Sequence, residues 1–143
     1  MLFRSGAPPE DAAPVPDAIR LDHATAGAGG VHLQPGPPLR VWIPPGYGHY
    51  GALIPIERRL PPGPCSIEAK FRLREGTVAF AFREKGKDDF LFSTGSFHAA
   101  DITRDLFLSV PECGRMDEVM IRGYALQPSV VELERLVLWA KGK

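Results

Sequence analysis

The chain has 143 residues, enough for one domain with its own hydrophobic core. Lysine plus arginine and aspartate plus glutamate number 17 each, so the formal net charge is zero. No overall field therefore draws the chain to nucleic acid or to an anionic membrane, and we expect neither as a partner.

The N-terminal segment predicts a flexible arm over residues 1–16, followed by a single domain over residues 17–143. Only Leu2 and Phe3 stand between Met1 and Arg4, and acids and prolines follow, unlike a secretory signal, so the expected location is the cytoplasm. Most of the 15 prolines lie before Cys65. Because proline is excluded from central strands and helix interiors, we expect short extended pieces there, at "AIRLD", "VHLQ", "LRVWI" and "ALIPIE".

The stretch "PPGYGHYGAL" at residues 44–53 is rich in rings and glycines. The glycines allow a tight reversal between "LRVWI" and "ALIPIE". Tyrosine and tryptophan also present flat apolar faces that suit sugar rings. One hypothesis is a sugar site formed by Trp42, Tyr47, His49 and Tyr50, and the alternative is that these rings only cover the end of the fold.

From Cys65 onward, apolar and polar residues alternate, which is typical of half-buried strands. The predicted strands are "SIEAKFRLRE", "TVAFAFRE", "DDFLFS", "LFLSV", "EVMIRGY" and "VVELERLVLWA". A two-residue turn at Glu75-Gly76 would make a hairpin that pairs Phe71 with Phe80. Turns at residues 85–87 and 94–95 would then pair Phe82 with Phe90 and bring Phe97 against Phe92.

These strands predict an all-β fold, an antiparallel two-sheet β-sandwich of the jelly-roll kind. Its last strand needs a bulge near Arg135 to bring Val131, Leu133, Leu136 and Leu138 onto one face. Residues Glu132, Glu134, Val137 and Trp139 would then face outward.

The predicted hairpins also place small and apolar residues on an outer face, at Ala79, Ala81 and Leu91. The registers set His98 beyond Leu91 and Lys70 and Arg72 alongside. This shelf is a candidate surface for a ligand or a second protomer. In the alternative, the Lys70 and Arg72 stems lie over the alanines and keep their charges in water.

No motif indicates a catalytic, cofactor or metal site: GxSxG, HExxH, CxxC and a phosphate-binding glycine loop are all missing from the sequence. Asp101 and Asp105 are interpreted as loop acids rather than calcium ligands. Without an export signal, Cys65 and Cys113 are expected to be free thiols.

Two segments carry a resemblance to a known group of proteins: "HYGALIPIERRLPPGPCSIEAKFRLREGTVAFAF" and, near the end, "SVVELERLVLW". They resemble β-sandwich accessory modules found beside bacterial sugar-modifying enzymes, including glycosyltransferases and methyltransferases. They are also broadly similar to carbohydrate-binding jelly rolls. The resemblance covers about the last two thirds of the chain. It implies a non-catalytic module whose partner is a glycan or a sugar-modifying enzyme, and it assigns no individual residue.

Three functions are compatible with these sequence features. The leading one is a non-catalytic glycan-binding or glycan-processing accessory module. The alternative is a protein-interaction or oligomerisation module, a homo-oligomer among the possibilities, that uses an outer sheet face as its interface. The third is a small carbohydrate hydrolase or lyase that uses Glu132 and Glu134, since glycosidases work with two carboxylates.

Overall fold

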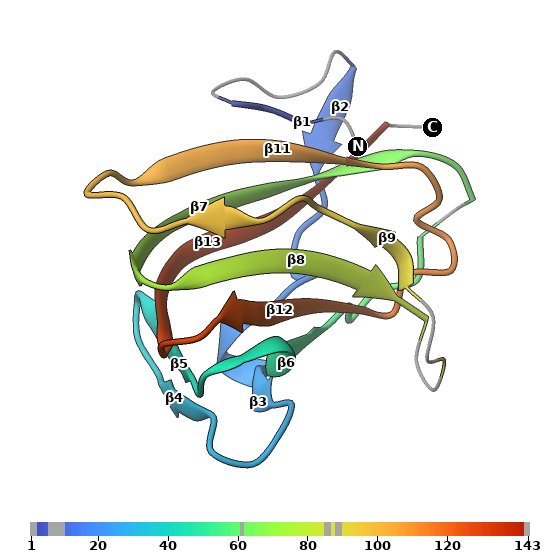
Figure 1. Cartoon of the computed structure of the whole chain (residues 1–143). Helices are drawn as coiled ribbons and strands as arrows, with labels where there is room; N and C mark the ends of the chain where they lie inside the picture. Colours follow the sequence, from blue (N-terminus) through green and yellow to red (C-terminus); the bar gives the residue numbers. More distant parts are fainter. Residues whose placement is uncertain (1–2, 6–10, 61, 85–86, 88–89, 142–143) are drawn as a thin grey trace.

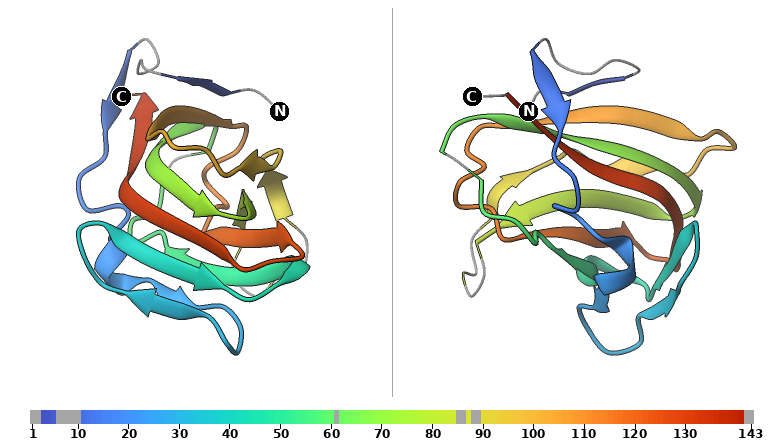
Figure 2. Two further views of the ribbon diagram at one scale, coloured as in Figure 1. Left: turned by 60° about the vertical axis from the view of Figure 1, so that its left-hand side comes forward. Right: turned by 180° about the vertical axis from the view of Figure 1, so that it is seen from behind.

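The structure is a computed structural model, and it describes residues 3–5, 11–60, 62–84, 87 and 90–141. Two antiparallel sheets lie as two layers, as Figures 1 and 2 show. The first, here called the β7 sheet, has the strand order β1 (Phe3–Ser5), β11 (Arg104–Val110), β7 (Cys65–Glu75), β13 (Ser129–Lys141), β5 (Leu39–Ile43) and β4 (His32–Gln34), and β2 (Ala12–Pro14) also pairs with β13.

The second layer, here called the β8 sheet, has the order β10 (Phe97–His98), β8 (Thr77–Arg83), β12 (Glu118–Ala125), β6 (Gly46–Pro55) and β3 (Thr25–Ala26), and β9 (Phe90–Ser93) also pairs with β8. The one helical element in the described residues is a short 3-10 turn, η1 (Leu21–His23). No described helix has the length and apolar character needed to cross a membrane. The predicted fold class, an all-β two-sheet sandwich, is confirmed.

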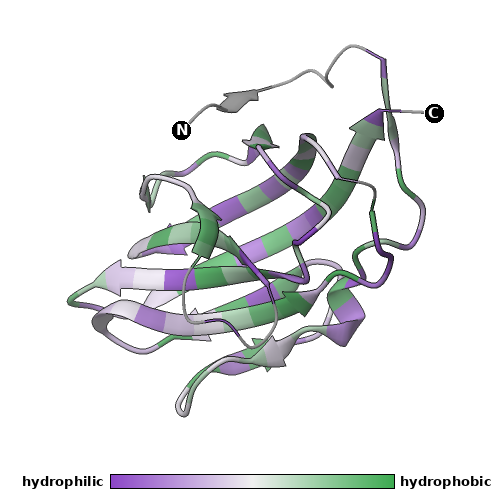
Figure 3. Cartoon of the chain, turned by 90° about the vertical axis from the view of Figure 1, so that its right-hand side faces the viewer, coloured by the Kyte–Doolittle hydropathy of each residue, from purple (hydrophilic) through white to green (hydrophobic). Residues whose placement is uncertain are grey.

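The core lies between the two sheets, and it follows from the period-2 alternation of the sequence. Hydrophobic and hydrophilic residues alternate along the strands in Figure 3. The inward-facing residues include Phe71, Phe80 and Phe82, all without exposed surface. The ring of Phe71 meets that of Phe80 at 5.2 Å and that of Phe97 at 5.5 Å, both edge to face. Such aromatic pairs stabilise a core by about 0.5–1.5 kcal/mol beyond their burial.

The hairpin predicted at Glu75-Gly76 is wrong, because β7 and β8 belong to different sheets. Phe71 and Phe80 do meet, but across the sandwich rather than along a ladder. Gly76 turns the chain from one layer to the other with a φ of +81°, and a Cβ there would lie 2.2 Å from Ser129 Oγ. That hydroxyl also bonds the backbone N and O of Thr77, each at 3.2 Å, which fixes the corner.

The registers predicted beyond β8 are also wrong in detail. Phe82 pairs with Phe92, and Phe97 pairs with Val78 of β8 instead of meeting β9. The strands β9 and β10 thus follow each other along one edge of β8. Most of the predicted turn at residues 85–87 lies outside the described residues.

The bulge predicted in the last strand is confirmed. The pairing of β13 with β7 shifts register between Leu133 and Arg135. As a result Val131, Leu133, Leu136 and Leu138 are all buried in the core. β13 pairs with β7 on one edge and with β5 and then β2 on the other. The bulge therefore keeps the apolar residues of this central strand on the core side along its whole length.

The proline-rich first part is more ordered into strands than the sequence suggested. Within the predicted arm, β1 pairs with β11 and β2 pairs with β13, and the flexibility of the arm stays a prediction. The strand predicted at "AIRLD" is wrong: this segment holds one isolated bridge, Ile19 to Ile56, and the start of η1. "LRVWI" is β5 as predicted, whereas the strand predicted at "ALIPIE" begins earlier, at Gly46.

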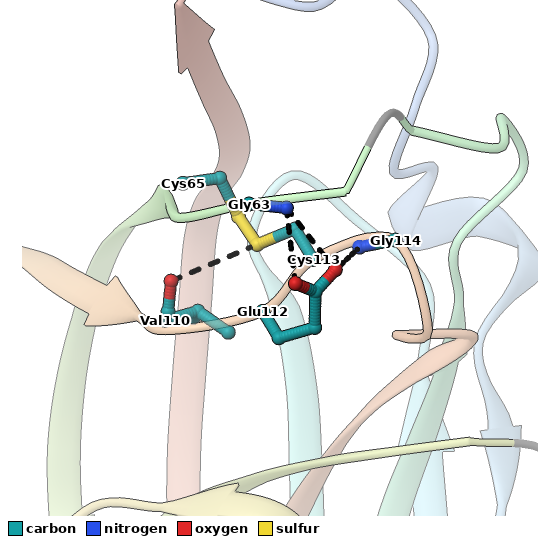
Figure 4. The surroundings of a disulfide bond; sticks show 6 residues. All are labelled: Gly63, Cys65, Val110, Glu112, Cys113 and Gly114. Atoms are coloured by element: carbon teal, nitrogen blue, oxygen red, sulfur yellow. Dashed lines mark hydrogen bonds between the residues drawn. A yellow bond between two sulfur atoms is a disulfide. The ribbon is translucent and has the colours of Figure 1, made fainter.

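The expectation of two free thiols is wrong, because Cys65 and Cys113 form a disulfide with their Cα atoms 6.0 Å apart. The two cysteines are 48 residues apart in sequence, but β7 begins beside the loop that follows β11. Figure 4 shows Glu112 beside the bridge, where its carboxylate accepts hydrogen bonds from the backbone N–H groups of Gly63 and Gly114 at 3.0–3.1 Å. The bridge and this carboxylate tie two loops at one end of the sandwich.

We predict that replacing both cysteines, Cys65→Ser with Cys113→Ser, lowers the free energy of unfolding by about 2–4 kcal/mol, since the bridge restricts a long segment of the unfolded chain. Urea unfolding followed by tryptophan fluorescence measures this. A reductant should lower the midpoint of the parent and leave the double variant unchanged. Equal midpoints for parent and variant in oxidising buffer would contradict the structural role of the bridge.

Candidate functional site

The glycine-rich stretch is not a turn but the first half of β6, and its irregular pairing with β12 decides where its rings point. Tyr47 pairs with Tyr124 and His49 with Gly123, so Gly48 is an extra residue in β6. Gly48 has a φ of +72°, which suits such a bulge. In a regular strand Tyr47 and Tyr50, three residues apart, would lie on opposite faces. The bulge puts both on the outer face of the β8 sheet, opposite Tyr124 and Arg122.

Arg122 lies at the centre of these rings. Its Cζ is 4.7 Å from the ring centroid of Phe90, 5.3 Å from that of Tyr124 and 5.4 Å from that of Tyr50. Its Nη2 donates a hydrogen bond to the carbonyl oxygen of Gly48 at 3.2 Å. We call this group the ring face: Tyr47, Tyr50, Phe90, Arg122 and Tyr124. The strands β6, β9 and β12 contribute to it, and cation–π contacts hold the arginine between aromatic side chains.

The predicted shelf is present in part but is covered by the chain itself. Ala79 is 2% exposed and Ala81 is fully buried, on the outer side of β8. Arg122 of β12 and Phe90 of β9 meet above β8, so their contact lies over these alanines. The neighbours predicted for the shelf, Lys70 and Arg72, belong to the other sheet, since the hairpin that would have brought them here does not form.

A pocket of about 460 Å³ adjoins the ring face at one end. Its lining residues come from four segments: Tyr47, Thr77, Ser96, His98, Tyr124, Ala125, Leu126 and Gln127. His98 Nδ1 lies 3.2 Å from the Thr77 hydroxyl. Tyr47 is 72% exposed and Leu126 is 76% exposed, and they are two of three large hydrophobic residues so exposed in the described chain. Exposed apolar side chains thus gather beside polar ones at this end of the sheet.

The structure brings together three of the residues proposed from the sequence, Tyr47, Tyr50 and His98, on the β8 sheet. His49 pairs with Gly123 and lies on the opposite face of β6 from Tyr50, with its Nδ1 3.2 Å from the Tyr50 carbonyl oxygen. Trp42 lies on β5 of the other sheet, 5.6 Å from the ring of His32.

The remaining charged candidates form ion pairs on the outer face of the β7 sheet. Lys70 lies 3.6 Å from Glu134, and Arg72 pairs with Asp101. Glu132, the other carboxylate of the hydrolase hypothesis, binds Arg74 at 2.7 Å. Each of the two glutamates therefore has its own cationic partner on β7, which accounts for both as part of a surface charge network. Asp105 lies 3.5 Å from Arg135.

Sequence reasoning missed Arg122, Tyr124 and Phe90. The predicted strand "EVMIRGY" contained the signal for the first two, because Arg122 and Tyr124 alternate with buried Ile121 and Gly123. An outward arginine beside an outward tyrosine could have been marked as a candidate. The predicted pairing of Phe82 with Phe90 places Phe90 in the core, and only the register shift between Phe82 and Arg83 turns it outward.

A second, mainly apolar pocket of about 380 Å³ lies beside the disulfide. It includes Cys65, Val110, Phe92 and Trp139 in its wall. The Trp139 ring packs edge to face on Phe107 at 5.8 Å, and its Nε1 donates to the buried carboxylate of Glu68 at 3.1 Å. Since the ring of Trp139 packs on Phe107 and its N–H bonds Glu68, we interpret this tryptophan as a packing residue.

Comparison with known proteins gives structural neighbours but no sequence family. No family model matches the chain, and no curated protein matches it. A mutant of a family 29 carbohydrate-binding module, solved in complex with mannohexaose, is similar with a TM-score of 0.61 and 16% identity over 96% of this chain and 86% of that one. Another mutant of a family 29 module gives a TM-score of 0.62 and 17% identity over 98% and 92%.

A third neighbour is the N-terminal cellulose-binding domain of β-1,4-glucanase C from Cellulomonas fimi, with a TM-score of 0.58 and 13% identity over 96% of this chain and 99% of that one. The chain has the β-sandwich fold of these modules. The resemblance noted in the sequence is therefore confirmed at the level of the fold.

We predict that Ala81→Glu lowers the free energy of unfolding by about 1–3 kcal/mol, because the larger side chain does not fit the fully buried position of Ala81 without displacing what packs over it. The matched control is Ser93→Glu, since Ser93 is the exposed cross-strand partner of Ala81 in β9 and should tolerate the change. Thermal unfolding of both variants makes the measurement. Equal stability of Ala81→Glu and the parent would contradict the burial of Ala81 beneath Arg122 and Phe90.

Proposed function

We propose that the chain is a non-catalytic glycan-binding module and that the ring face is its binding surface. The observation that supports this most is the placement of three tyrosines on the outer face of the β8 sheet, two of them, Tyr50 and Tyr124, in contact with Arg122. Tyrosine rings stack on the apolar faces of sugar rings while their hydroxyls stay in water. The neighbouring pocket adds the hydroxyl, imidazole and amide groups of Thr77, His98 and Gln127, which suit sugar hydroxyls.

The fold supports the same proposal. The neighbours with this fold include a module solved with mannohexaose and a cellulose-binding domain. The role of Tyr47, Tyr50 and His98 in binding is part of the proposal, as is the further expectation that the module accompanies a bacterial sugar-modifying enzyme. Trp42, His49, Lys70 and Arg72 are left out of the proposed site, since they lie on other faces or form ion pairs elsewhere.

The location of the chain is also a proposal. The sequence alone predicts a cytoplasmic location, but a disulfide is typical of oxidising compartments. We therefore favour an oxidising compartment, where a polysaccharide ligand would also be accessible.

We predict that Tyr47→Ala weakens glycan binding by about 1–3 kcal/mol, the scale known for aromatic stacking on bases, with almost no change in thermal midpoint. The reason is that 72% of this side chain is exposed, so it contributes little to packing. A glycan array identifies ligands of the parent, and titration calorimetry measures both proteins.

The control is Ile102→Ala, because Ile102 is another exposed large hydrophobic residue, 58% exposed, next to the Asp101 that pairs with Arg72 of the other sheet. It should bind like the parent. Unchanged binding in Tyr47→Ala would reject the ring face as the site. A parent that binds no glycan but dimerises in sedimentation would favour the protein-interaction alternative.

A further inference from the structure

Arg122 is a half-buried cation that has no carboxylate partner among the described residues. Its one hydrogen bond within them is to the neutral carbonyl oxygen of Gly48. Its Nε is buried and has no hydrogen-bond partner in the described part of the chain. Removing a guanidinium from water in this way is unfavourable, and the three surrounding rings offset only part of the cost.

The strand registers show why Arg122 lacks a carboxylate partner on the β8 sheet whereas Arg83 has one. On the same face of β12, Glu118 stands opposite Arg83 of β8 and forms an ion pair with it. Four residues further along the same strand and on the same face, Arg122 stands opposite Ala79 of β8 on one side and Tyr50 of β6 on the other. The sheet thus supplies a carboxylate to one outward arginine, and supplies a small residue and a ring to the next.

The pocket that adjoins the ring face also lacks an acidic side chain among its described lining residues. Tyr124 contacts Arg122 and also lines the pocket. The lining residues include tyrosines, hydroxyls, an amide and His98, and none of the described lining residues is acidic. A ligand between Arg122 and this pocket meets a positive charge and no acidic lining residue, and the carboxylate on the same face, that of Glu118, is already paired with Arg83.

Building on the proposed glycan-binding function, we infer that the ligand is an acidic glycan and that Arg122 binds the carboxylate of a uronic acid residue. A guanidinium offers two parallel N–H donors that match a carboxylate, and such charge-assisted bonds are stronger than bonds to neutral hydroxyls. The rings around Arg122 stack on the sugars while the arginine recognises the acidic group. The carboxylate also supplies the counter-charge that the fold withholds from Arg122.

The test compares sugars that differ only at C6, where the neutral sugar has a hydroxymethyl group and the acidic sugar a carboxylate. Titration calorimetry on the full chain uses two pairs of hexasaccharides with identical linkages within each pair: mannohexaose with its mannuronic acid counterpart, and cellohexaose with its glucuronic acid counterpart. We expect at least one acidic hexasaccharide to bind about 10- to 100-fold more tightly than its neutral partner, the ratio that a charged hydrogen bond gives. High salt should reduce this preference.

Two variants assign the preference to Arg122. Arg122→Gln should bring the acidic and neutral sugars to equal affinity, and Arg122→Lys should keep part of the preference, because it keeps the charge without the fork of donors. Arg115→Gln is the control, since Arg115 lies outside the ring face, pairs with Glu84 at 3.2 Å and should not affect the preference. The comparison on the parent needs no variant, so it holds even if an Arg122 variant fails to fold.

Each outcome decides a different point. Neutral sugars that bind as tightly as acidic ones would overturn this inference and leave the glycan-binding function standing. Failure of all four hexasaccharides to bind would contradict both. Equal binding of an oligoglutamate peptide would also overturn it, since an acidic peptide rather than an acidic glycan would then satisfy Arg122.

Discussion

The structure depends on one constraint: the chain must change layers between β7 and β8. Both strands carry apolar residues on alternate positions, Phe71 among them in β7 and Phe80 and Phe82 in β8, and such residues can pack either along a ladder or across a core. The corner at Gly76, held by Ser129, forces the second arrangement, so that Phe71 and Phe80 meet between the sheets. The corner also leaves both edges of β8 free for strands of its own sheet, β12 on one edge and β9 and β10 on the other, and this pairing places Arg122 opposite Ala79.

A second level of control comes from bulges, which decide which side chains reach the outer surface. The extra residue Gly48 brings Tyr47 and Tyr50 to one face, and the shift beside Phe82 turns Phe90 outward. In β13 a bulge does the opposite and keeps four aliphatic residues inside. Short irregularities in pairing therefore convert regular strands into a surface where two tyrosines and a phenylalanine surround one cation and Tyr47 lies beside them.

These two features also explain how far the sequence could predict the structure. Period-2 alternation identified the strands from Cys65 onward, and the misphased leucines of the last strand revealed its bulge. Alternation alone cannot distinguish a hairpin within one sheet from a corner between two sheets, because Phe71 and Phe80 would lie close together in either arrangement. The Cys65–Cys113 bridge depends on which loops meet in three dimensions, and Arg122 becomes notable only when its cross-strand neighbours are known to be Ala79 and Tyr50.

The most direct test of the central claim, that the outer face of the β8 sheet binds a glycan, is an NMR titration of the labelled chain. Backbone amide shifts would be followed on addition of mannohexaose and, separately, of the matching mannuronic acid hexasaccharide. If the ring face is the site, the shifts cluster at Tyr47–Tyr50, Ala79–Ala81 and Arg122–Tyr124. Shifts confined to the β7 sheet or to the pocket beside Trp139, or no shifts with either sugar, would contradict the claim.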